Sequence, residues 1–267
     1  MKIIASLTTI PSRIDLFLPT LQSIVNQTIA VDSIEINIPY IFKRTGETYK
    51  IPEWLLNLEQ DSKNSKCKIQ IFRTEDYGAI TKVAPTLIRH KDDVDTYVWS
   101  LDDDYMYPVN MLAVLYREFI PERNYVLSHS CGYWKCNISS RECEGYLSTR
   151  KEGYAAFLEG FATVLYPTSI IKDDFEKYII MTSETLDCRN SDDIIISNYL
   201  SMKNVKIYNC SFPYSSTKQL FLDLTLPHSQ SKDSLHKQGG GNQERYIRVF
   251  NWLKSHNLNS WVAQLPA

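Results

Sequence analysis

The stretch that decides the fold is TYVWSLDDD at positions 96–104. Its first six residues form a run suited to a strand buried on both faces, and three aspartates follow without a gap. Open α/β sheets bind ligands outside the carboxyl ends of their strands, which is where Asp102, Asp103 and Asp104 are expected. Three adjacent carboxylates repel one another unless a cation joins them. This position favours a metal and diphosphate site over a solvated acidic turn.

The sequence before this stretch alternates short strands with helices. Apolar runs or a period of two predict strands, and aliphatic residues at helical spacing predict helices. The expected strands are residues 2–7, 33–38 and 68–72, and the expected helices are residues 16–25 and 84–89. This order predicts an α/β fold with a mostly parallel central sheet and helices on both faces.

The sequence after it is more mixed. We expect a helix at 110–119, strands at 125–129, 161–166 and 205–208, and an irregular hairpin or loop at 131–155. Asp192 and Asp193 open an apolar helix, which Asp192 is expected to cap. A last amphipathic helix follows the glycines at 239–241, and its apolar face is expected to pack into the core. Peripheral contact of this helix with a membrane is the less favoured alternative.

Composition excludes several classes of protein. The chain has 267 residues, which suits one large domain, and 43% hydrophobic residues, which excludes a disordered protein. Lys and Arg number 29 against 31 Asp and Glu, so the basic excess of a nucleic-acid-binding protein is missing. No apolar run suits a transmembrane helix, and the first residues are too short a run for a signal peptide. We expect a cytoplasmic protein, with its oligomeric state left open.

The six cysteines are expected to be reduced thiols in that compartment. A zinc site at Cys131, Cys136 and Cys143 with His129 is an alternative, but no CxxC pair is present, so a role as small buried side chains is favoured. The chain also lacks the GxxxxGK[ST] and GxGxxG patterns. Their absence excludes a P-loop enzyme and a Rossmann dinucleotide site.

Six motifs give the chain a family resemblance. They are TTIPSR at 8–13, DYGAITK at 76–82, the aspartates at 102–104, EGF at 159–161, the acid pair at 192–193 and LHKQGGGN at 235–242. In this order the sequence resembles an inverting, family 2-like GT-A glycosyltransferase, in the compact form seen in bacterial glycan clusters and large DNA viruses. The resemblance implies a Rossmann-like GT-A fold with a single catalytic domain at 1–267. Residues 1–105 would be its nucleotide-binding half and residues 106–267 its acceptor-binding half.

The resemblance also implies an activity and a site. A sugar would pass with inversion from a nucleotide-diphosphate sugar, most often a UDP-sugar, to a glycan or other hydroxyl acceptor. The nucleotide-sugar would be bound by Thr8, Ile10, Arg13, Asp76, Gly78, Lys82, Asp102, Asp103, Gly160 and Lys237. A divalent metal, Mn²⁺ or Mg²⁺, would be held by Asp104, Asp102 and His236, with His228 as the rival histidine. The catalytic residues would be Asp193, as general base, and its neighbour Asp192.

Several alternatives stay open. The same metal chemistry suits a retaining transferase or a nucleotidyltransferase, and the aspartate triplet alone suits a non-catalytic, calcium-dependent carbohydrate-binding module. The aromatic residues of the segment at 130–155 are candidates for stacking on an acceptor sugar, with hydrophobic packing as the default. These are Tyr133, Trp134, Tyr146 and Tyr154. The glycine-rich loop at 231–242 is expected to close over the donor, carrying His236 and Lys237 towards its phosphates.

Overall fold

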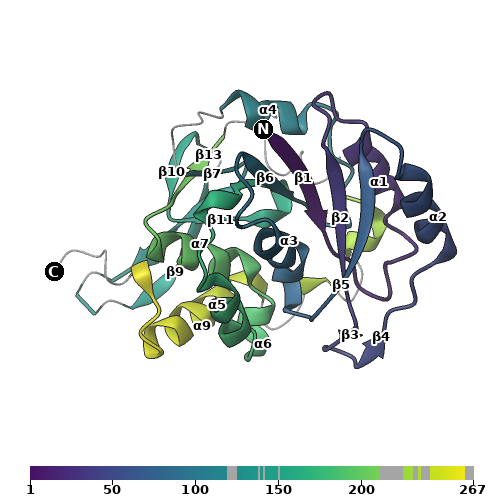
Figure 1. The fold of residues 1–267 in the computed structure, drawn as a ribbon. Coiled ribbons are helices and arrows are strands. Elements are labelled where there is room, and N and C mark those ends of the chain that lie inside the picture. The colour runs from purple at the N-terminus through teal and green to yellow at the C-terminus, as the bar shows by residue number, and fades with distance from the viewer. Residues whose placement is uncertain are drawn as a thin grey trace.

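An eight-stranded sheet forms the centre of the protein (Figure 1). The computed structural model describes residues 1–118, 125–137, 139–140, 142–149, 151–210, 225–230, 234–235 and 241–261. Across the sheet, the strands are β10 (Gly153–Ala155), β13 (Lys206–Asn209), β7 (Tyr125–Ser128), β12 (Val164–Pro167), β6 (Thr96–Ser100), β1 (Lys2–Leu7), β2 (Ser33–Pro39) and β5 (Lys68–Thr74). Neighbours are parallel from β6 to β5, and β12 runs antiparallel to both β6 and β7. The prediction of an α/β fold with a mostly parallel sheet is confirmed.

Helices cover both faces of this sheet. One buried cluster packs α3 (Ala84–Arg89), α5 (Phe175–Thr182), α6 (Leu186–Arg189), α7 (Asp192–Met202) and α9 (Gly241–Ser255) on one face. A second cluster packs α1 (Leu18–Val25), α2 (Glu53–Ser62) and α4 (Met111–Arg117) on the other. Alternate residues of β6 supply both clusters, because Val98 belongs to the first and Tyr97 and Trp99 to the second. The central strand is therefore buried on both faces up to the point where the three aspartates begin.

The predicted elements of the parallel half are confirmed to within about two residues, as is usual for element ends. The predicted strand at 161–166 begins only at Val164, because residues Gly160–Ala162 form a 3-10 turn. The helices α2, α5 and α6 were not predicted. Among the described residues, no helix combines the length and the apolar surface needed to span a bilayer.

The expected irregular hairpin at 131–155 is confirmed, but its extension into a second sheet was not predicted. Strands β8 (Cys131–Cys136) and β9 (Cys143–Thr149) form a hairpin, and β11 (Phe157–Leu158) extends it into a second, three-stranded sheet. Trp134 anchors this sheet, since its ring centroid lies 4.9 Å from those of Phe157 and Phe250 and 5.1 Å from that of Trp261. The aromatic contacts join segments far apart in the chain, so local composition did not reveal them.

Buried polar contacts fasten α3 to β2. The side chain of Glu35 is 2% exposed, and its carboxylate accepts a hydrogen bond from Arg89 Nε (3.1 Å) and lies 2.7 Å from His90 Nε2. Burial opposes ionisation of Glu35, but the contacts with His90 and Arg89 lower its pKa below the ordinary value. The hydrogen bond to Glu35 in turn raises the pKa of His90. This ion-pair network holds the segment that precedes the functional site.

We predict that Glu35→Gln lowers the free energy of unfolding by about 2 kcal/mol at pH 6, because Arg89 and His90 lose a buried counter-charge. A raised His90 pKa contributes stability at low pH that is lost as the pH rises through the folded-state value. The penalty should therefore shrink between pH 6 and pH 9. Urea unfolding at both pH values measures it, with the exposed Glu47→Gln as control. A penalty that grows with pH would contradict this account.

Candidate active site

A cavity of about 550 Å³ opens at the carboxyl ends of β1 and β6. The structure brings together there most of the residues that the sequence singled out, from segments far apart in the chain. The predicted residues among its lining are Thr8, Ile10, Arg13, Asp76, Gly78, Lys82, Asp102, Asp103, Asp104, Asp192 and Asp193. Gly160 is in contact with Asp193, whereas His236 and Lys237 lie outside the described residues.

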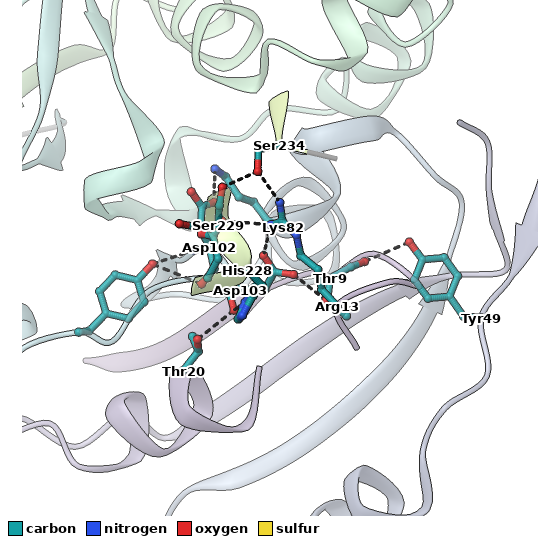
Figure 2. Close-up of polar contacts among 12 residues, drawn as sticks. Thr9, Arg13, Thr20, Tyr49, Lys82, Asp102, Asp103, His228, Ser229 and Ser234 are labelled. Carbon is teal, nitrogen blue, oxygen red and sulfur yellow. Dashed lines mark hydrogen bonds and ion pairs between the residues drawn. The ribbon is translucent and has the colours of Figure 1, made fainter. Parts of the chain in front are cut away.

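Asp103 holds the turn that follows β1. Its carboxylate accepts hydrogen bonds from Thr9 Oγ1 (2.6 Å) and Arg13 Nη1 (3.1 Å), and its side chain is 9% exposed. Its backbone carbonyl accepts a further bond from Thr20 Oγ1 at 2.9 Å. Figure 2 shows Thr9, Arg13 and Thr20 converging on this one aspartate. The middle acid of the triplet thus ties the 8–13 turn to the end of β6.

Arg13 also neutralises part of the charge on Asp104. Its Nη1 lies 3.0 Å from Asp104 Oδ2, and its Nη2 donates to Ser234 Oγ at 3.2 Å. Burial raises the pKa of Asp104 to about 8, and the neighbouring carboxylates of Asp103 and Asp102 add to the shift. Because the pKa stays high despite the contact with Arg13, ionisation of Asp104 is disfavoured unless a further cation lies beside it.

Lys82 links the triplet to the second acid pair. Its ammonium lies 2.8 Å from Asp102 Oδ1 and 2.8 Å from Asp192 Oδ2, and its side chain is 9% exposed. Burial alone would lower the pKa of Lys82, but the carboxylates, chiefly Asp102 and Asp192, raise it well above the ordinary value. The lysine is therefore a fixed positive charge between two acidic groups. The Ser6 hydroxyl holds the lysine's backbone by donating to its carbonyl at 2.6 Å.

Asp193 points into the same region and is held by two donors. Its Oδ1 accepts from the backbone N–H of Gly160 at 2.7 Å, and its Oδ2 accepts from the hydroxyl of Tyr246 at 2.6 Å. A Cβ at position 160 would lie 2.9 Å from Asp193 Oδ1 and 3.0 Å from Lys82 Nζ, so only glycine fits without displacing them. Burial raises the pKa of Asp193 to about 7, and the nearby Asp192 carboxylate contributes. This is a suitable pKa for a base near neutral pH.

The expectation that Asp192 caps its helix is wrong. The N-cap position is Ser191, no side-chain cap bond is formed there, and Asp192 is the first helical residue. The side chain of Asp192 turns instead to Lys82. The Asp192 carboxylate lies 2.8 Å from the buried Lys82 ammonium. This attraction outweighs the stabilisation from a helix-capping hydrogen bond, which is typically about 1 kcal/mol.

Asp76 and Gly78 brace the opposite wall of the cavity. The Asp76 carboxylate, 3% exposed, accepts from the N–H groups of Lys43 and Gly78, both at 2.7 Å, and from Arg189 Nη2 at 2.9 Å. Gly78 has a φ of +80°, and a Cβ there would lie 2.1 Å from the carbonyl oxygen of Arg189. The lack of a side chain at Gly78 therefore lets its backbone lie directly against α6.

Three functional contacts were not predicted from the sequence. Tyr246 was expected on the apolar face of its helix and, with Arg245, beside the glycine-loop motif, but its hydrogen bond to Asp193 was not predicted. Arg245 lines the cavity and donates to Ser191 Oγ at 3.1 Å, and Arg189 binds Asp76. Nothing in local spacing marks these residues, because their roles depend on how α6 and α9 pack against the sheet.

Of the two histidines proposed as metal ligands, His228 lies among the described residues and His236 does not. His228 lies beside the triplet, where its Nε2 is 3.3 Å from the backbone carbonyl oxygen of Asp103 (Figure 2). Its segment is tied there, since Leu226 N–H donates to the carbonyl of Asp104 at 2.8 Å. The neighbouring segment that carries His236 lies outside the described residues.

Asp102 and Asp104 suit a hard divalent cation. Both supply carboxylate oxygens, and burial raises the pKa of each, so a cation beside them would stabilise their ionised forms. Within the described residues, no three or more His, Cys, Asp or Glu side chains form a complete metal-binding group. A two-carboxylate site is the arrangement in which Mg²⁺-like ions take their remaining ligands from phosphates and water.

The described residues do not support the zinc alternative, and two of the four aromatic residues considered for sugar stacking pack into the core instead. His129 Nδ1 lies 3.2 Å from the carbonyl oxygen of Cys210, and His129 forms no metal-ligand group with Cys131, Cys136 and Cys143. Trp134 and Tyr146 pack against the core, so the default of hydrophobic packing is confirmed for these two. Tyr133 and Tyr154 are exposed, and the hydroxyl of Tyr133 donates to the carbonyl of Tyr154.

Comparison with known proteins adds no relative. No protein-family model matches the chain, and a search of curated proteins finds no match.

We predict that Lys82→Met lowers the free energy of unfolding by about 3 kcal/mol at pH 8, because Asp102 and Asp192 lose their shared counter-ion in a buried site. Lys91→Met is the matched control, since Lys91 pairs with Asp173 at the surface and its loss should change little. Urea unfolding of both variants measures the difference. Equal stability of the two variants would refute the role given to Lys82.

Proposed function

We propose that this protein is a GT-A-like glycosyltransferase that moves a sugar from a nucleotide-diphosphate donor, with UDP as the first candidate nucleotide, to a hydroxyl acceptor. One observation carries the proposal. Two acidic groups, the triplet at the end of β6 and the pair at the start of α7, share one cavity and one buried lysine. A sugar transferase needs these two groups, one beside the leaving diphosphate and one beside the acceptor.

Unpaired donors in the cavity support an anionic ligand. The Nε atoms of Arg13 and Arg189 are buried and have no hydrogen-bond partner among the described residues, although both arginines line the cavity. A buried N–H group without a partner costs about 1–3 kcal/mol, which an incoming phosphate or nucleoside oxygen would recover. Arg44 and Arg245 bring the guanidinium groups in the described lining to four.

A divalent cation, Mn²⁺ or Mg²⁺, fits beside Asp102 and Asp104 and would supply charge neutralisation to the leaving diphosphate. Asp104 is the preferred candidate ligand because the resemblance assigns the metal to the last acid of the triplet, although burial raises the pKa of Asp102 as well. The Asp102 carboxylate is already paired with the ammonium group of Lys82. Asp103 has a different role, because both of its carboxylate oxygens hold the turn that carries Arg13.

Asp193 is the proposed general base. It takes the proton of the acceptor hydroxyl as the acceptor oxygen bonds to the anomeric carbon and the bond to the diphosphate breaks. The Gly160 N–H and the Tyr246 hydroxyl fix the carboxylate so that it does not need to reorganise. Asp192 keeps Lys82 in place and raises the pKa of Asp193.

The direct test is UDP release from a panel of UDP-sugars, with Mn²⁺ and with simple sugar acceptors. A glycosyltransferase releases UDP and forms an acceptor glycoside of inverted anomeric configuration. Retention of configuration would indicate a retaining transferase, and release of pyrophosphate from a nucleoside triphosphate a nucleotidyltransferase. Sugar binding that needs calcium, without turnover, would indicate a carbohydrate-binding module.

We predict that Asp193→Asn lowers kcat by about a hundredfold to ten-thousandfold, the usual contribution of a positioned base. Donor affinity should change little, because the base acts on the acceptor proton in the transition state. The matched control is Asp187→Asn, whose carboxylate binds Arg248 at the surface, 2.8 Å from its Nε. The parent kcat should fall as the pH drops below about 7, because burial raises the pKa of Asp193 to about 7 and protonation removes the base.

Steady-state kinetics and UDP titration calorimetry give both quantities. Unchanged turnover in Asp193→Asn would place the base elsewhere, and a parallel loss of UDP binding would make Asp193 a donor ligand.

We predict that Asp104→Asn weakens Mn²⁺ binding at least tenfold in the presence of UDP, while the variant stays folded. Folding is preserved because the substitution removes one of three mutually repelling carboxylates. Electron paramagnetic resonance of free Mn²⁺ measures the binding, and EDTA should abolish turnover of the parent. Full Mn²⁺ affinity in the variant, or full activity in EDTA, contradicts the metal assignment.

A further inference from the structure

The hairpin of β8 and β9 brings two cysteines face to face. Cys136 is the last residue of β8 and Cys143 the first of β9, and the two are direct partners in the antiparallel ladder. The Cys143 thiol donates to the backbone carbonyl of Gly145 at 3.5 Å. Both are free thiols in this structure. None of the roles proposed above uses either of them.

An irregularity in the ladder creates this pairing. Lys135 pairs with Gly145, but Cys136 pairs with Cys143, so Glu144 is an extra residue on β9. A regular ladder would have placed Cys136 opposite Glu144. The turn beyond the pair is held by the N–H of Asn137, which donates to the carbonyl of Glu142 at 2.9 Å. The bulge therefore places the two cysteines opposite each other, next to the hydrogen bond between Asn137 and Glu142.

The backbone geometry suits a disulfide. Directly opposed residues of an antiparallel ladder have Cα atoms about 4.5–5.5 Å apart, within the range of about 4.4–6.8 Å that disulfides span. The two thiols also differ in access, since Cys136 is half-buried and Cys143 is 8% exposed. An external reagent reaches Cys136 first, and Cys143 is in place to react second.

We propose that Cys136 and Cys143 are a modification site, a dithiol pair that forms a disulfide by exchange with glutathione disulfide or a similar small disulfide. The Cys136 thiolate attacks one sulfur of glutathione disulfide, and the first glutathione thiolate leaves. The Cys143 thiolate then attacks the Cys136 sulfur and expels the second glutathione. The two protein thiols are oxidised, glutathione disulfide is reduced to two glutathiones, and the two thiol protons end on these products.

The bond would fasten a hairpin that supports the candidate active site. The ring of Tyr146 on β9 lies 5.2 Å from that of Tyr246 on α9, and Tyr246 holds Asp193. Gln243 of α9 also packs directly on Gly145. The bond closes a short loop, which restricts the unfolded chain, so the oxidised protein should melt about 5 °C higher.

The test incubates the full-length protein with mixtures of reduced and oxidised glutathione, followed by acid quenching, alkylation and tryptic mass mapping. Trypsin cleaves after Lys135 and Arg141 and so separates the two cysteines. The expected product is a pair of cross-linked peptides, 136–141 with 142–150, two hydrogens lighter than the two reduced peptides together. Cys136→Ser should lose both the cross-link and the rise in melting temperature.

Cys67 is the internal comparator, because it is half-buried like Cys136 and lies just before β5. Cys67→Ser should keep the cross-link and the rise in melting temperature. Two outcomes would overturn the proposal. In the first, Cys136 and Cys143 are both still alkylated under conditions that have already glutathionylated Cys67. In the second, Cys136 forms a stable adduct with glutathione and no disulfide with Cys143. Neither outcome depends on the proposed sugar transfer.

Discussion

The candidate active site depends on one buried ammonium group. Lys82 lies between Asp102, at the end of the central strand, and Asp192, at the start of α7, at 2.8 Å from each carboxylate. Without this charge the two acidic groups would repel each other across a site with little access to water. The lysine also couples the two halves of the chain, because β6 belongs to the parallel half and α7 to the mixed half. Folding of each half therefore completes the same site.

The described residues neutralise this acidic site only in part, and the proposed metal binding depends on the charge that remains. Arg13 and Lys82 are the cations in direct contact with the triplet, yet burial and neighbouring carboxylates keep the pKa of Asp104 near 8. Such a site favours an incoming cation. Asp193 differs, since its donors are a backbone N–H and a tyrosine hydroxyl, and burial raises its pKa to about 7. One acidic region thus holds the proposed cation site and the proposed base in separate environments.

The sequence predicts the parallel half well because its strands show either a buried run, as in TYVWS before the triplet, or a period of two, as in SIEINI and KIQIF. It also places the two acidic groups correctly at a strand end and at a helix start. It fails where long-range packing decides. The strands β8 and β9 depend on the packing of Trp134 against Phe250 and Trp261. Asp192 does not cap its helix, because its carboxylate pairs with Lys82 from another segment. Tyr246 shows the same limit, since one side chain serves both core and site.

The most direct measurement of the central claim is the position of Mn²⁺ in crystals soaked with UDP and MnCl₂, located by anomalous scattering. The account predicts a single strong peak about 2.2 Å from a carboxylate oxygen of Asp104, with UDP phosphate oxygens completing its coordination in the cavity beside Arg13 and Lys82. A peak at another cluster, or UDP bound in the cavity with no metal near the triplet, would contradict it.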